Sequence, residues 1–134
     1  MDYKIIDIPK ITDPRGNLAV LEKDTIPFKI QRVYYLYDVP SDSHRGGHAH
    51  IECMELLIAI SGSFTVELDN GKEKQTLVLN KPNKGLLIPT MVWRELSDFS
   101  SGAMCLVLAS HEFEEPDYIR DKAVFYSKTT LGFI

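Results

Sequence analysis

The feature of this sequence that most limits its fold is a series of short apolar runs, which turn residues interrupt at about 8–12-residue intervals. The clearest run, residues 64–68, alternates apolar and polar side chains as a half-buried strand does. Asp69, Asn70 and Gly71 follow it and predict a hairpin turn, because Asn-Gly accepts the positive φ that tight hairpins need. Such a series, without a long amphipathic helix, predicts an all-β sandwich or barrel. We expect strands at residues 18–23, 28–39, 54–60, 64–68, 74–79, 85–89, 92–96 and 103–110, and a short helical turn within residues 114–121.

Two of these runs, residues 55–60 and 105–109, are apolar on both faces instead of alternating. A strand with this pattern is covered on both sides. The opposing sheet covers one side, and a partner subunit or an overlying loop covers the other. The pattern therefore favours a dimer, although a thick single core is the alternative.

Composition excludes several classes of protein. The formal charge of −4 and the absence of a Lys/Arg cluster argue against a nucleic-acid or membrane-surface protein. No apolar run approaches the ~20 residues that span a bilayer, and the first residues lack a signal-peptide pattern. The two cysteines, Cys53 and Cys105, lie in apolar runs without a CxxC pair, so we expect buried free thiols. A reducing cytoplasm is the expected compartment.

The sequence HRGGHAH at residues 44–50 concentrates three of the four histidines. In an extended segment, His48 and His50 project from the same face, roughly 6.5–7 Å apart along the strand. Two glycines before them allow close backbone approach to a ligand. The pair is either part of a metal site or an acid–base pair, since both protonation states of histidine are accessible near neutral pH.

The spacing of His48, His50, Glu55 and Gly62 resembles the first motif of the cupins, small jelly-roll β-barrels. We therefore expect residues 1–134 to form a single cupin domain, with a short C-terminal tail after about residue 115. In metal-binding cupins a histidine of a second motif completes the metal site, but here that position holds Arg94. Arginine has no lone pair to offer a metal. The departure favours proton transfer by the two histidines without a metal.

Seven segments together resemble the dTDP-4-keto-6-deoxyglucose 3,4-ketoisomerases, a family of sugar-nucleotide cupins. They are DPRGNLAVLE, RVYYLYDVP, HRGGHAH, SGSF, IPTMVWREL, FSSGAMCLVLAS and PDYIRD, within about residues 5–126. The resemblance implies an isomerase that moves a carbonyl between C4 and C3 of a dTDP-linked 6-deoxyhexose, without metal or redox cofactor. It also implies a cytoplasmic homodimer with exchanged N-terminal strands. The product would serve deoxysugar biosynthesis, as a precursor of 3-amino-3,6-dideoxy sugars for lipopolysaccharide, other surface glycans or antibiotics.

The chemistry suggests roles for particular side chains. We expect His50 to be the base at C3 and His48 the acid or shuttle. A phenol could donate to the oxygen that gains charge, and we favour Tyr35, then Tyr37, because the side-chain neighbours of Tyr35 are uncharged. Relatives usually carry a neutral residue near Glu55, which could bind a sugar hydroxyl or raise the pKa of a histidine.

The substrate's diphosphate should meet arginine side chains. Arg15 and Arg45 lie in glycine-containing turns, where loops hold ligands, and Arg94 takes the position of the missing metal ligand. Trp93 is expected either to stack on the nucleotide base or to fill the core.

Three other functions remain open from the sequence. The first is a metal-dependent cupin enzyme that uses His48, His50 and Glu55. The second is a non-catalytic sugar-binding cupin. The third is a sugar-nucleotide epimerase, which begins with the same abstraction of an α-proton.

Overall fold

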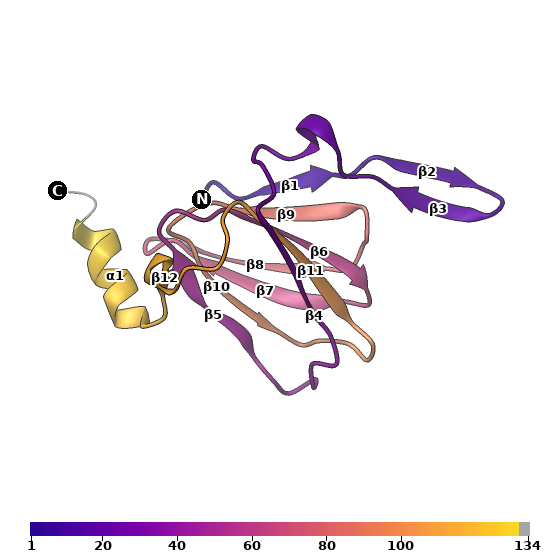
Figure 1. Cartoon of the computed structure of the whole chain (residues 1–134). Coiled ribbons are helices and arrows are strands. Elements are labelled where there is room, and N and C mark those ends of the chain that lie inside the picture. The colour runs from indigo at the N-terminus through magenta and orange to yellow at the C-terminus, as the bar shows by residue number, and fades with distance from the viewer. Residues whose placement is uncertain (132–134) are drawn as a thin grey trace.

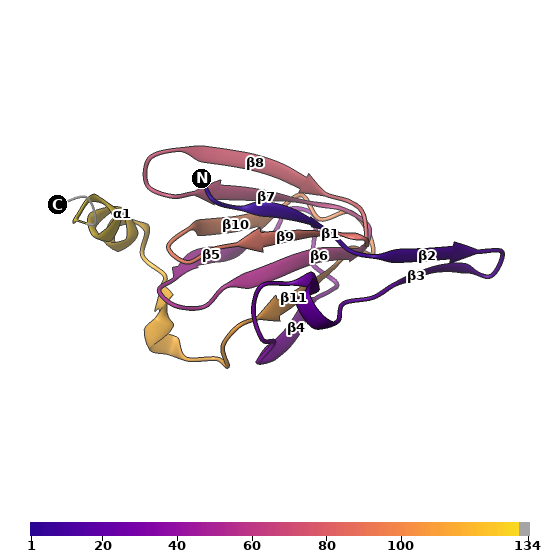
Figure 2. The same cartoon turned by 90° about the horizontal axis from the view of Figure 1, so that it is seen from above.

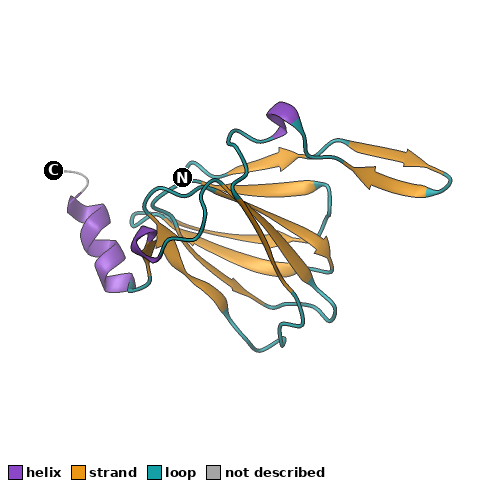
Figure 3. Ribbon diagram, in the orientation of Figure 1, coloured by secondary structure: helices purple, strands orange, loops and turns teal. Residues whose placement is uncertain are grey.

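Two antiparallel five-stranded sheets pack face to face in a jelly-roll β-barrel, as expected (Figures 1 and 3). The computed structural model describes residues 1–131. The first sheet has the strand order β1 (Lys4–Asp7), β9 (Lys84–Ile88), β6 (Glu55–Ser61), β11 (Met104–Ala109) and β4 (Arg32–Leu36). The second has the order β12 (Tyr118–Ile119), β5 (Arg45–His50), β10 (Trp93–Ser97), β7 (Phe64–Asp69) and β8 (Lys74–Leu79).

The main core lies between the two sheets, where inward-facing residues of alternating strands meet. Phe64, Val66 and Leu68 of β7 face this core, as their alternation predicted. Leu57 and Val107 face them from β6 and β11. The strands of the sandwich are therefore oriented by the period-2 burial of their own side chains.

The doubly apolar strands β6 and β11 are covered on their outer face by the N-terminal part of the same chain. Leu56 and Leu108 pack there in a second buried cluster, together with Ile8 and Ile26. Ile26 follows a short 3-10 turn at Lys23–Thr25. An overlying segment of this chain thus provides the cover that the sequence required.

The hairpin of β2 (Lys10–Asp13) and β3 (Gly16–Ala19) projects away from the barrel (Figures 1 and 2). Ile11 and Leu18 lie opposite each other on it and are largely exposed. The sequence predicted one strand at residues 18–23, so both its start and its end were wrong. The polar turn TDPRGN was correctly placed, but its preceding strand was missed.

The C-terminal segment adds structure that the sequence did not predict. The expected helical turn is present as a 3-10 turn at Glu115–Asp117, and β12 then pairs with β5. Helix α1 (Lys122–Leu131) follows and stands beside the end of the barrel (Figure 1). Phe125 of α1 packs with Trp93 and Ile119 in a third buried cluster, so this segment is anchored next to the histidine-bearing strand.

Several local predictions can be compared with the structure. The hairpin at residues 69–71 joins β7 to β8, and Gly71 has φ +93°. The strand expected at residues 28–39 is shorter, since β4 covers only Arg32–Leu36. Cys53 and Cys105 are buried free thiols, as predicted. No helix among residues 1–131 is long and apolar enough to cross a membrane.

Candidate active site

A cavity of about 540 Å³ opens between the two sheets, and the histidine-bearing strand β5 forms one of its walls. Arg45, Gly46 and His48 line it from β5, and Glu55 and Arg94 line it from β6 and β10. Further lining residues come from β4 and from the segment after β11: Arg32, Tyr34, Phe113, Tyr118 and Arg120. The cavity is therefore rich in cationic and phenolic groups.

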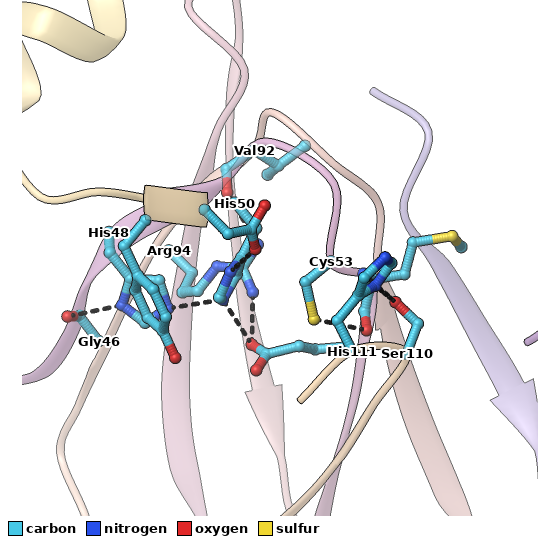
Figure 4. Close-up of polar contacts among 12 residues, drawn as sticks. Gly46, His48, His50, Cys53, Val92, Arg94, Ser110 and His111 are labelled. Carbon is cyan, nitrogen blue, oxygen red and sulfur yellow. Dashed lines mark hydrogen bonds and ion pairs between the residues drawn. The ribbon is translucent and has the colours of Figure 1, made fainter. Parts of the chain in front are cut away.

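The two imidazoles are in direct contact, with their Nε2 atoms 3.1 Å apart (Figure 4). Nδ1 of His48 lies 3.0 Å from the carbonyl oxygen of Gly46, and Nδ1 of His50 lies 2.8 Å from Oδ2 of Asp117. His48 lines the cavity, whereas His50 is fully buried and lies outside the lining. His50, which we expected to be the base at C3, thus does not line the cavity of this structure.

Gly46 makes the contact with His48 possible. It has φ +87°, a conformation that favours glycine, and a Cβ at this position would lie 3.1 Å from the carbonyl oxygen of Arg94. The close approach of β5 and β10 at this point requires a residue without a side chain. Gly46 therefore shapes the wall that holds His48.

Glu55 and Arg94 form a buried ion pair beside the histidines. Nη1 of Arg94 donates to Oε1 of Glu55 at 2.7 Å, and Nη2 donates to the carbonyl oxygen of Val92 at 3.0 Å. Arg94 lies directly opposite His48 in the pairing of β10 with β5. The turn between β5 and β6 brings Glu55 to the same site, with Oε1 3.5 Å from Nε2 of His50.

This arrangement does not suit a metal ion. Ligand atoms of His48, His50 and Glu55 lie within 4.8 Å of one another. However, Oε1 of Glu55, the oxygen nearest to the histidines, already accepts a hydrogen bond from Arg94. The Nε2 atoms of His48 and His50 are directed at each other, so neither is free for a metal. A divalent ion there would have to displace a buried cation and break both contacts. The donor set therefore fits proton transfer better than metal binding.

The pKa values of the site follow from burial and charge. Burial and the positive charge of Arg94 lower the pKa of His48 to about 4. Burial alone would raise the pKa of Glu55, but His50 and Arg94 outweigh it and lower that pKa to about 2. At neutral pH the site thus contains a neutral His48 next to an ionised Glu55.

Tyr34, not Tyr35, is the tyrosine of β4 that faces the cavity. Its hydroxyl donates to Oε2 of Glu55 at 2.7 Å, and burial followed by the charge of Glu55 raises its pKa. Tyr35 and Tyr37 are 56% and 60% exposed on the outer side. The alternation along β4 was predicted correctly, but we expected the face with Tyr35 and Tyr37 to point inward. That choice was wrong because we took the charged residue beside Tyr34 as evidence that its face is exposed to solvent.

The charged neighbour is Arg32, to which we assigned no role from the sequence. It lines the cavity beside Tyr34, and its Nη2 lies 3.7 Å from Oε2 of Glu55. Among the described residues, Nε of Arg32 and Nε of Arg94 are buried without a hydrogen-bond partner. Each of these N–H groups is therefore an unused donor beside the cavity, enclosed by protein in this structure.

The other predicted binding residues lie in different places. Arg45 lines the cavity. Arg15 stands on the projecting hairpin, 90% exposed and paired with Asp13 at 2.7 Å. Trp93 packs against Phe125 in the core instead of facing the cavity. Of the two readings for Trp93, the structure supports the core one.

Three residues of the C-terminal segment reach the site and were not proposed from the sequence. Tyr118 lies against both imidazoles, with ring centroids 4.9 Å from His48 and 4.4 Å from His50. Arg120 lines the cavity, and Asp117 contacts His50. All three residues lie in the segment PDYIRD, which carries part of the family resemblance. That resemblance is the signal that could have identified them as site residues.

Comparison with known proteins agrees with the fold. The family model described as FdtA, WxcM-like, C-terminal matches residues 1–130. A TDP-4-oxo-6-deoxy-alpha-D-glucose-3,4-oxoisomerase of Aneurinibacillus thermoaerophilus is 43% identical over 121 residues, which are 90% of this chain and 87% of that protein.

Solved structures of 3,4-ketoisomerases share this fold over nearly the whole chain. A 3,4-ketoisomerase of Helicobacter canadensis is 44% identical, with a TM-score of 0.94 over 97% of this chain and 98% of the other. The 3,4-ketoisomerase QdtA of Thermoanaerobacterium thermosaccharolyticum, solved as a mutant in complex with TDP-4-keto-6-deoxyglucose, is 36% identical. Its TM-score is 0.96 over 99% of this chain and 97% of that one. A dTDP-4-dehydrorhamnose 3,5-epimerase of Bacillus anthracis, 12% identical with a TM-score of 0.77, shares the fold alone.

Proposed function

This chain belongs to the FdtA (WxcM-like, C-terminal) family, and from that premise we propose that it is a sugar-nucleotide 3,4-ketoisomerase. It converts dTDP-4-keto-6-deoxyglucose to a dTDP-3-keto-6-deoxyhexose. The support is the identity of 43% and 44% to proteins named for this activity. The observation in the molecule that best supports it is the cavity-facing imidazole of His48, backed by a second imidazole at 3.1 Å.

The reaction moves one proton from C3 to C4 and one from the C3 oxygen to the C4 oxygen, with no net change in oxidation state. A base removes the proton from C3, the C3–C4 double bond forms, and the C4 oxygen takes a proton to give an enediol. The C3 hydroxyl then loses its proton as the C3 carbonyl forms, and C4 receives a proton. Substrate and product are isomers, so the reaction needs no electron acceptor.

His48 is the residue that we assign to the exchange of protons with the substrate carbons. It lines the cavity, and its lowered pKa leaves it neutral at physiological pH, as a base must be. His50 lies behind it and does not line the cavity. This assignment reverses the roles that we expected from the sequence, where His50 was the base.

Tyr34 replaces Tyr35 as the phenol that we assign to the oxygen that gains charge. Its raised pKa keeps the hydroxyl protonated, so it can donate a hydrogen bond to the developing enediol. In the free protein that hydroxyl donates its one proton to Glu55, so it exchanges this partner for the substrate oxygen during the reaction. The guanidinium groups of Arg32 and Arg94, which line the cavity, are our candidates for binding further sugar or phosphate oxygens. Arg45, at the rim, is our candidate for the diphosphate.

We also propose a homodimer formed through the projecting hairpin of β2 and β3. Its apolar pair, Ile11 and Leu18, is exposed in the single chain. In such a dimer Arg15 could reach the partner's cavity, which would explain a binding residue so far from the cavity of its own chain. The two buried free thiols suit the reducing cytoplasm that we propose as its compartment.

The test is to incubate the protein with dTDP-4-keto-6-deoxyglucose in deuterated water and to follow the sugar by proton NMR. We expect a 3-keto isomer with deuterium at C4, formed at the same rate with and without a metal chelator. Deuterium at C5 would indicate an epimerase. Loss of activity with the chelator would indicate a metal-dependent cupin, and binding without turnover would indicate a non-catalytic sugar-binding cupin.

A further inference from the structure

The carboxylate of Asp117 is the least exposed acidic group near the histidines that the reaction above does not use. Its Oδ2 lies 2.8 Å from Nδ1 of His50, and its Oδ1 accepts the backbone N–H of Glu52 at 2.6 Å. The 3-10 turn at Glu115–Asp117 carries it, directly before β12. Asp117 is therefore fixed by two contacts and does not line the cavity.

The partners of the two rings determine where protons must be. A carbonyl oxygen only accepts hydrogen bonds, so Nδ1 of His48, 3.0 Å from the oxygen of Gly46, carries a proton. A carboxylate also only accepts, so Nδ1 of His50, facing Asp117, carries a proton. A neutral imidazole carries one N–H proton, which in each ring is the one on Nδ1. If both rings were neutral, neither Nε2 atom would have a proton, and two lone pairs would face each other at 3.1 Å. A hydrogen bond at this distance requires one further proton between them.

We propose that Asp117 is a positioning residue that fixes His50 with a proton on Nδ1, so that the two imidazoles together hold three N–H protons and share one of them between their Nε2 atoms. This inference rests on the proposed function for its kinetic consequence only. The pair then acts as a single unit with one positive charge, in which His48 meets the substrate and His50 stores a proton behind it.

Charged groups surround the pair unevenly. Asp117 and Glu55 supply two negative charges, and Arg94 and Arg32 supply two positive charges. Both carboxylates contact His50 directly, whereas both guanidinium groups contact Glu55, so His50 is the imidazole nearest to negative charge. The other titratable groups that face His50 are the phenol of Tyr118, at a centroid distance of 4.4 Å, and the thiol of Cys53.

The shared proton belongs mainly to His50. Two carboxylates flank His50, whereas Arg94 and burial disfavour a charged His48. His48 then keeps a lone pair on Nε2, as a base requires. The imidazolium of His50 donates to that lone pair and can return a proton once His48 has passed one on.

The test is the ¹⁵N chemical shifts of the imidazole nitrogens in the wild-type protein near pH 7. His48→Asn and His50→Asn assign the signals. We expect three of the four imidazole nitrogens of His48 and His50 to be protonated. The imine-type shift should belong to Nε2 of His48 alone, or be averaged between the two Nε2 atoms if the shared proton moves between them. An unprotonated Nδ1 on His50, or only two protonated nitrogens in the pair, would overturn the proposal whether or not the protein is an isomerase.

Asp117→Asn tests the role of the carboxylate. The asparagine amide has one oxygen, whereas the carboxylate has two, which face Nδ1 of His50 and the backbone N–H of Glu52. If its NH₂ group faces Nδ1 of His50, that nitrogen must be unprotonated in order to accept the hydrogen bond. We expect the Nδ1 signal of His50 to become imine-type. We further expect kcat to fall about 10–100-fold with little change in KM.

Glu112→Gln is the matched control, because it removes an exposed carboxylate from the same segment. It should leave the ¹⁵N shifts and kcat at wild-type values. An unchanged Nδ1 shift in Asp117→Asn would contradict the positioning role. If the shifts behave as expected and no 3,4-isomerisation occurs, the proposed function fails and the proton count stands.

Discussion

At the scale of single residues, the direction of each side chain decides which groups can meet the substrate. Tyr34 and Tyr35 are adjacent on β4, yet one contacts Glu55 in the cavity and the other is exposed. A sequence pattern with period 2 separates these faces but does not say which is inside. Here the buried Glu55 makes the charged and phenolic face the inner one, because it provides partners for Arg32 and Tyr34.

Tyr34→Phe therefore tests the choice of tyrosine. We expect kcat to fall by about 10²-fold, because the variant lacks the hydroxyl that stabilises the developing oxyanion. Tyr35→Phe, on the outer face, should change kcat less than about twofold. Steady-state kinetics measures both, and thermal unfolding shows whether each variant is folded. Equal losses in the two variants would mean that the outer phenol also has a role.

The pKa of His48 predicts an unusual pH dependence. A histidine with the ordinary pKa of 6.5 is about 90% protonated at pH 5.5, and a base of that kind would lose about tenfold in rate between pH 7.5 and 5.5. With a pKa of about 4, His48 stays almost entirely neutral at pH 5.5 and becomes protonated only as the pH falls through 4. We expect kcat/KM at pH 5.5 to remain within about twofold of its value at pH 7.5. A decline centred near pH 6.5, in folded protein, would argue against His48 as the base.

At the scale of secondary-structure elements, the C-terminal segment holds the rear wall of the site. β12 pairs with β5, matching Tyr118 with His50, and α1 buries Phe125 against Trp93 and Ile119. The sequence predicted the strands with strong alternation, such as β7, to within a residue. It did not predict α1, because most apolar residues of this ten-residue helix are adjacent, at positions 123–126, instead of recurring at a helical period, and its packing partners come from distant strands.

Phe125→Ala tests whether this helix anchors the segment. The side chain is fully buried, so we expect the free energy of unfolding to fall by about 3–5 kcal/mol. Val124→Ala, at a largely exposed position of the same helix, should cost under about 1 kcal/mol. Denaturant unfolding measures both. A loss for Phe125→Ala no larger than that of the control would show that α1 contributes little to the fold.

At the scale of the whole molecule, the projecting hairpin is the part that the barrel leaves without a cover (Figure 2). Most of the site can be built from one chain, but Arg15 is far from it. The sequence motifs predicted the barrel and the participation of His48, Glu55 and Arg94 in one cluster. They could not predict which histidine lines the cavity, because that depends on the contact of β12 and its turn with β5, which no local pattern encodes.

Ile11→Glu with Leu18→Glu tests the dimer. These residues lie opposite each other on the hairpin, and a partner subunit would bury both. We expect the double variant to sediment as a monomer, since burying unpaired carboxylates in an apolar interface costs several kcal/mol. Val78→Glu, at an exposed apolar position on β8, should leave the wild-type oligomer intact. A double variant with the wild-type sedimentation coefficient would exclude this interface.

The most direct measurement is the loss of the C3 deuterium from C3-deuterated dTDP-4-keto-6-deoxyglucose in ordinary water, followed by proton NMR. We compare the wild type with His48→Asn and His50→Asn. If His48 is the group that meets C3, His48→Asn should show no exchange above background, while His50→Asn should exchange slowly but measurably. Exchange in His48→Asn at or above the rate of His50→Asn would contradict the assignment of His48 as the base.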